Sequence, residues 1–203
     1  MGYSDLYRPP SWPPHLISCS SPPMFSPGST SMIRIPSNNR GRRQVIVPQR
    51  LYDPHHRQNY FDQSILGNSI TFLSHSRGDG IALTDVMNEK FDHLIGRDDP
   101  MFVTCMGSAI ILRLEWPGYK VWDRQIRTKD WRREPKPITK AKLANEVAKM
   151  VQKFIQDSVN EPITPGSERW RVGPGFIEVR DLVLVRLVHV SKGSWQAEFR
   201  AFE

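Results

Sequence analysis

The sequence predicts an α+β fold, a single small domain with a mainly antiparallel sheet, two helices and a C-terminal β-hairpin. Apolar residues recur at helical spacing in two segments, 83–95 and 138–159. Ile110, Leu112 and Leu114 alternate with Ile111, Arg113 and Glu115, which predicts a strand with one more polar face near its end. Two runs rich in β-branched and aromatic residues flank the turn SKGS near the C-terminus. The resulting order of strand, helix, strands, helix and hairpin favours one α+β domain.

Composition divides the chain near residue 67. Residues 1–66 hold ten of the 17 prolines and seven arginines but no lysine, and they show neither helical nor alternating periodicity. Such a segment cannot bury enough apolar surface to offset the entropy of ordering it. We therefore predict a disordered Pro/Ser/Arg-rich arm over 1–66 and an α+β domain over 67–203. Within the arm, the segment RQVIVPQRLY can form a short strand or a docking segment.

The first half of the predicted domain contains a strand, a helix and a further strand. Residues 69–74 indicate a strand that the turn SRGDG closes. The helix is expected over 83–95, with Thr84 or Asp85 capping its start and Gly96 ending it. After the turn RDDP, residues 101–116 are expected to form one or two strands, and KVWDRQI is expected to return antiparallel after Pro117-Gly118.

The second helix has the clearest pattern. Thr139 is its expected cap, and its apolar stripe consists of Leu143, Val147, Met150, Val151 and Phe154. The opposite side is predicted to be a solvated face with internal ion pairs, formed by Lys142, Glu146, Lys149 and Lys153.

Charge, cysteine content and hydropathy restrict the class of protein. The net charge of +7 permits acidic partners without requiring them. Two distant cysteines cannot form a disulfide framework. No apolar run approaches the roughly 18 residues of a membrane span, and the N-terminus lacks the features of a secretory signal. We expect an intracellular protein of the nucleus or cytoplasm, without membrane association.

Catalytic and metal-binding patterns are weak. No CxxC, HxxxH or HExxH spacing is present, and the adjacent His55 and His56 would point to opposite faces of a strand. A P-loop is excluded because its spacing is missing. A hydrolase or transferase built on Cys105, His93 and Asp98 is a distant alternative, but a thiol in such an apolar run is typical of a core residue. We expect no catalytic residue, no metal and no cofactor.

A basic and aromatic stretch offers the best candidate for a binding site. From Lys120 to Lys153 there are eleven basic and four acidic residues, giving +7 locally. Indole rings can stack on bases while the cations bind phosphate. The residues of such a nucleic-acid site would be Trp122, Arg124, Arg127, Trp131, Arg132, Arg133 and Lys149. Alternatively, the tryptophans belong to the core and the arginines cover them.

Four segments carry a resemblance to a known group of proteins. These are GRDDPMF, LRLEWPGY, RQIRTKDWRREPKPITKAKLANEVAK and DLVLVRLVHVSKGSWQ. They resemble a family of uncharacterised basidiomycete fungal proteins in which a disordered leader precedes such a domain. The resemblance covers roughly residues 70–200 and implies a regulatory or structural setting, with no activity or ligand attached.

Two functional hypotheses follow. The first is a non-enzymatic intracellular interaction domain that binds a protein partner. The second is a nucleic-acid-binding protein that uses the basic stretch 120–153, since a basic excess is an electrostatic indication of such a partner. Binding of oligonucleotides at two salt concentrations would separate them.

Overall fold

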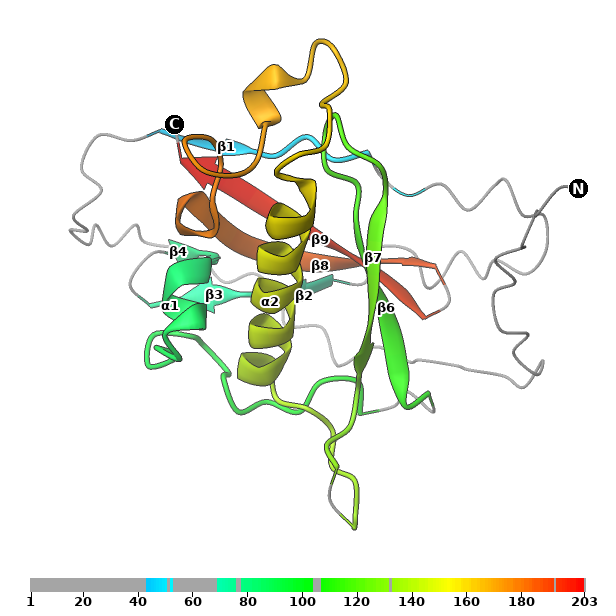
Figure 1. Ribbon diagram of the computed structural model, residues 1–203. Coiled ribbons are helices and arrows are strands. Elements are labelled where there is room, and N and C mark those ends of the chain that lie inside the picture. Colours follow the sequence, from blue (N-terminus) through cyan, green and yellow to red (C-terminus); the bar gives the residue numbers. More distant parts are fainter. Residues whose placement is uncertain are drawn as a thin grey trace, which may run out of the picture.

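The C-terminal hairpin forms the middle of the sheet in the computed structural model (Figure 1). The structure describes residues 43–50, 52, 69–75, 78–103, 107–131, 133–191 and 193–202. Strands β8 (Leu182–Ser191) and β9 (Ser194–Phe202) pair antiparallel along their lengths. Gly193 has a positive φ of 76° in the connecting turn, a conformation that favours glycine. The predicted hairpin is confirmed.

Five further strands extend this hairpin into a seven-stranded sheet. The main order is β2-β8-β9-β6-β7, with β5 also on β8 and β1 also on β9. All pairs are antiparallel except β6 with β9. The added strands are β1 (Gln44–Ile46), β2 (Ser69–Thr71), β5 (Ile81–Ala82), β6 (Ala109–Leu114) and β7 (Trp122–Arg127). A separate two-stranded sheet consists of β3 (Leu73–Ser74) and β4 (Gly78–Asp79). The α+β class is therefore confirmed.

Helix α2 (Lys140–Ser158) lies across one face of the main sheet (Figure 1). Thr139 caps it as predicted, because its hydroxyl accepts a 3.2 Å hydrogen bond from the Lys142 amide. The whole predicted apolar stripe is buried. On the solvent side, Glu146 lies 3.2 Å from Lys142 and 3.8 Å from Lys149, so the predicted ion pairing is also present.

An aromatic cluster fixes the C-terminal half of α2 on the sheet. The ring of Trp116 lies 5.7 Å from that of Phe154 and 6.2 Å from that of Phe199, measured between centroids. The buried indole N–H of Trp116 donates a 2.8 Å hydrogen bond to the carbonyl of Trp170. This bond ties the segment that carries two short 3-10 helices, η3 (Glu168–Trp170) and η4 (Val179–Asp181), to the core.

The predicted first helix is wrong in length and in its cap. Helix α1 spans only Leu83–Met87, and its N-cap is Ala82, which makes no side-chain cap bond. The chain then turns through Glu89, whose φ is 56°. Residues 94–95 instead reach β3, where the Ile95 amide donates a 2.9 Å bond to the Leu73 carbonyl. Tertiary pairing thus overrides the helical spacing of residues 88–95.

The predicted strand 69–74 is divided at Phe72. The Phe72 side chain is fully buried, and its backbone connects β2, which pairs with β8, to β3, which pairs with β4. The single predicted strand 69–74 therefore contributes one strand to each of the two sheets.

Strand β1 lies within the range predicted as an arm. It pairs with the C-terminal end of β9, and the next residue, Val47, is buried. This is the segment whose sequence allowed a short strand, and the folded unit includes it. Residues 1–42, 51 and 53–66 of the predicted arm lie outside the described residues.

Two glutamine side chains hold the chain that follows β1. The Gln49 amide nitrogen donates to the Ala197 carbonyl, while its oxygen accepts a 2.9 Å bond from the Glu115 amide. Gln196 in turn accepts from the Tyr52 amide at 3.0 Å. Gln49 therefore bridges β9 and the end of β6, at the point where these strands separate.

Burial raises the pKa of the Glu115 carboxyl group, and the charges of Arg113 and Arg50 oppose this shift.

Candidate interaction surface

Among the described residues, strand β7 is the last strand on its side of the sheet and pairs only with β6. Hydrogen-bonded pairs alternate along an antiparallel ladder. The Thr128 amide donates a 3.0 Å bond to the Ser108 carbonyl, in continuation of the β6–β7 register. By alternation, Arg124 and Ile126 also bond to β6. The peptide groups of Asp123, Gln125 and Arg127 therefore point to the open edge.

The loop after β7 has a fixed base. Lys129 and Pro137 form an isolated antiparallel bridge, and the Asp130 amide donates a 2.9 Å bond to the Lys136 carbonyl. The Asp130 carboxylate accepts a 2.9 Å bond from the Lys136 amide, as aspartate commonly does in turns. Strand β7 ends at Arg127 and the chain bends at Thr128. The bonds between 129–130 and 136–137 then fix the base of the loop that carries Trp131.

Trp131 is 79% exposed. The guanidinium carbon of Arg127 lies over its ring, 3.2 Å from the centroid. The other tryptophans of the described residues are buried or half-buried. An exposed indole held beside an arginine is thus a specific feature of this loop. We refer to β7 and the loop 128–137 together as the basic edge.

The cations of the basic edge differ from those of α2 in their partners. On α2, Lys142, Lys149 and Lys153 all pair with carboxylates. Within the described part of the chain, the cations of the basic edge have no ion-pair partner; they are Arg124, Arg127, Lys129, Arg133 and Lys136. Their positive field is therefore available to an acidic partner.

The structure separates the residues predicted for a nucleic-acid site. Trp122 is half-buried, and its ring packs edge-on to Phe154 with centroids 6.3 Å apart, which gives it a structural role. Lys149 lies on α2 beside Glu146. Arg132 lies outside the described residues. The structure places the remaining four residues together on the basic edge, namely Arg124, Arg127, Trp131 and Arg133.

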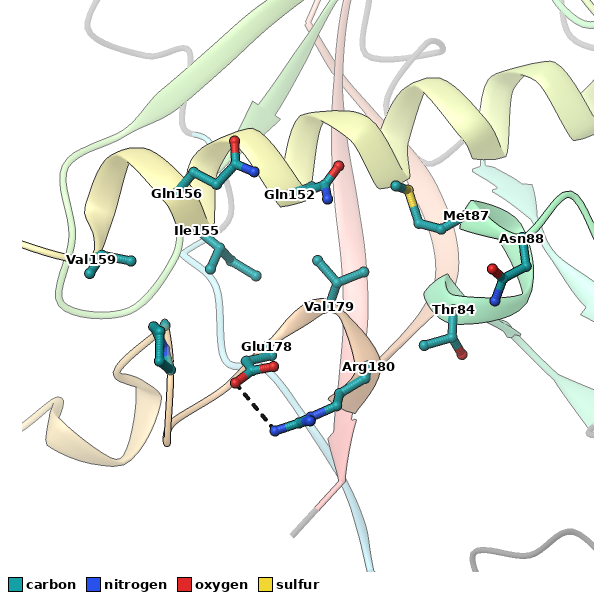
Figure 2. Close-up of a pocket in the computed structure, with 12 residues that line it drawn as sticks. Thr84, Met87, Asn88, Gln152, Ile155, Gln156, Val159, Glu178, Val179 and Arg180 are labelled. Atoms are coloured by element: carbon teal, nitrogen blue, oxygen red, sulfur yellow. Dashed lines mark hydrogen bonds and ion pairs between the residues drawn. The ribbon is translucent and has the colours of Figure 1, made fainter.

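A groove between α1, α2 and the 178–180 segment is a second candidate binding site. The sequence analysis did not predict it. Figure 2 shows its lining from α1, α2 and the 178–180 segment. It measures about 490 Å³ and combines apolar side chains with the amides of Asn88, Gln152 and Gln156. Its charged residues, Glu178 and Arg180, form an ion pair with each other at 3.2 Å. The one signal in the sequence is the spacing of Gln152 and Gln156, one helical turn apart.

The geometry gives no support to the distant catalytic alternative. His93 is exposed in a turn after α1, and Asp98 binds Arg97 at 3.2 Å. Cys105 lies outside the described residues. The described residues contain no group of three His, Cys, Asp or Glu side chains that could hold a metal ion. Likewise, no helix among them is long and apolar enough to cross a membrane.

Comparison of the chain with protein-family models, curated proteins and solved structures finds no match in any of the three. The resemblance to basidiomycete fungal proteins therefore stays a prediction. Function must be inferred from the geometry of the molecule itself.

Proposed function

We propose that the chain is a non-enzymatic interaction domain that binds a protein partner through the basic edge. The observation that carries this proposal is the exposed indole of Trp131, fixed by Arg127 on a loop with a hydrogen-bonded base. Tryptophan and arginine are the residue types most enriched at the energetic centres of protein interfaces. A preorganised pair of them loses little side-chain entropy on binding.

Nucleic acid is the second candidate, favoured by the cations around Trp131 that have no ion-pair partner among the described residues. Single-stranded nucleic acid is bound by successive aromatic rings, each stacking on one base. The basic edge offers one exposed ring, and the Arg127 guanidinium already covers one face of it. Because Trp122 packs on Phe154, it does not supply a second ring. A protein partner therefore fits this surface better.

Peptide display on the full-length protein tests the proposal. We expect selection to enrich peptides that bind the wild-type chain and bind Trp131→Ala about tenfold or more weakly, as loss of an interface anchor predicts. Lys149→Ala is the matched control, since this cation lies on α2 and pairs with Glu146. Peptides that bind Trp131→Ala as well as the wild type would overturn the proposal.

Oligonucleotide titration in parallel decides between the two candidates. Nucleic-acid binding would show an affinity that falls steeply with salt, with a slope set by the number of phosphates contacted. Tight, Trp131-dependent oligonucleotide binding without any enriched peptide would replace the protein partner by nucleic acid.

A further inference from the structure

We propose that the partner binds as an additional β-strand along β7, and that the bound segment is extended and acidic. This inference rests on the proposed function, to which it adds the mode of binding and the chemistry of the bound segment. Three independent features of the basic edge support it, namely its backbone, its side-chain charges and the position of Trp131.

The backbone of the basic edge has the pattern that strand addition requires. Alternation places the peptide groups of Asp123, Gln125 and Arg127 outward, along the whole length of β7. In the described part of the chain, no hydrogen bond involves the outward peptide groups of these three residues. An exposed row of N–H and C=O groups is the template on which an extended peptide adds a strand.

The side chains determine which peptide fits. Arg124 shares its face of β7 with Trp122 and Ile126, towards α2, while Arg127 projects on the opposite face. Both arginines are exposed and have no ion-pair partner among the described residues. Opposite charges on directly facing residues of neighbouring strands stabilise pairing. A bound segment should therefore carry two acidic residues three positions apart, one on each face.

The acidic residue of β7 does not oppose this arrangement. Asp123 lies at the start of the strand, and its carboxylate is 3.7 Å from the guanidinium of Arg113 on β6. The rest of β7, which carries Arg124 and Arg127, therefore keeps its positive charge. Trp131 lies against Arg127, the last residue of β7, so an apolar residue at one end of the added strand would contact its exposed ring.

Charged edge residues also serve to prevent sheets from associating edge to edge. That role needs cations on the edge but no preorganised tryptophan, because an exposed indole promotes association instead. The 79% exposure of Trp131 beside the same edge favours recognition over protection.

Fluorescence anisotropy with synthetic peptides tests the inference on the full-length chain. The probe is a labelled peptide of about seven residues, near the usual strand length, made of threonine and valine with two glutamates three positions apart. A second peptide has lysines in place of the glutamates, and a third has the glutamates adjacent. We expect the first peptide to bind at least about tenfold more tightly than the other two, because only it matches both arginines.

Backbone methylation then tests the mode of binding. N-methylation removes one peptide donor, and only every second residue of an added strand donates to its neighbour. Methylation at alternate positions should therefore abolish binding, while methylation at the positions between should leave it within about twofold. Equal effects at all positions would overturn strand addition.

Protein variants separate this inference from the proposed function. Arg124→Glu should weaken binding of the acidic probe about tenfold or more, whereas Arg171→Glu, an exposed arginine that lies over Phe176, should not. Suppose that peptides selected by display lose affinity for Trp131→Ala, but that methylation weakens peptide binding equally at all positions. The proposed interaction surface is then supported, and binding by strand addition is overturned. If the acidic probe binds and Trp131→Ala has no effect on any peptide, the proposed surface fails. Absence of binding by all three probes would overturn the inference.

Discussion

Arg127 lies 3.2 Å above the ring of Trp131, measured from its guanidinium carbon to the ring centroid. Both side chains are exposed, so the pair buries little apolar surface. An exposed cation–π contact contributes only about 0.5–1 kcal/mol. The contact therefore positions the indole without adding much to the stability of the fold.

The first prediction concerns this pair. Trp131→Ala should lower the free energy of unfolding by no more than about 1 kcal/mol, since only an exposed contact is lost. Chemical denaturation of the wild type and the variant measures the difference. A loss of several kcal/mol would mean that Trp131 belongs to the core and is not presented to a partner.

The second prediction compares the two faces of α2. Phe154→Ala should cost on the order of 3–5 kcal/mol, because Phe154 packs against Trp116, Tyr119 and Trp122 and would leave a cavity. Lys149→Ala should change stability by no more than about 0.5 kcal/mol. Thermal melts of both variants test this directly. Equal melting temperatures for the two variants would show that the helix is placed on the wrong face.

The third prediction concerns β1. Val47 is 3% exposed, whereas its neighbour Ile46 is 67% exposed. Val47→Ala should destabilise the domain by about 1–3 kcal/mol through lost burial, and Ile46→Ala by no more than about 0.5 kcal/mol. Urea unfolding of the full chain measures both. If the two substitutions have the same small effect, residues 43–50 do not belong to the folded unit.

The fourth prediction concerns the pH dependence of stability. Burial raises the pKa of Glu115 above its ordinary value of 4.5. The folded chain then holds this proton more tightly than the unfolded chain, so stability is lost as the pH rises from 4.5 through the folded-state pKa. Glu115→Gln removes this dependence. The stability of the variant relative to the wild type should therefore increase between pH 4 and pH 7.

Denaturation of both proteins across this pH range gives the comparison. The control is Asp157→Asn, since this exposed carboxylate binds Lys153 at the surface of α2. A relative stability of Glu115→Gln that stays constant with pH would contradict the account of Glu115.

Much of the fold was predictable because local and tertiary preferences agree. In α2, the cap at Thr139 and the buried stripe ending at Phe154 follow from the sequence pattern alone. The same holds for β6, where Ile110, Leu112 and Leu114 are buried as their alternation predicts. In α1, the two preferences conflict. The helical spacing continues beyond Met87, but the pairing of residues 94–95 with β3 prevails.

The candidate site was predictable only in part. The basic and aromatic composition of 120–153 pointed to the correct region, but composition cannot tell Trp122, packed on Phe154, from Trp131, exposed on the loop. That difference arises from the alternation of β7 and from the turn at Asp130, which follow from pairing with β6 and with 136–138. The place of β7 at the sheet edge depends on the strand order, which the sequence does not encode locally.

Amide hydrogen exchange along β7, measured by NMR on the full chain, tests the central claim most directly. In the free protein, the amides of Arg124 and Ile126 should be protected, while those of Asp123, Gln125 and Arg127 should exchange rapidly, because they point to the open edge. Addition of the acidic probe peptide should slow exchange at these three amides. Uniform protection along β7 in the free chain, or rapid exchange at the three amides when the peptide is bound, would contradict recognition by an open strand edge.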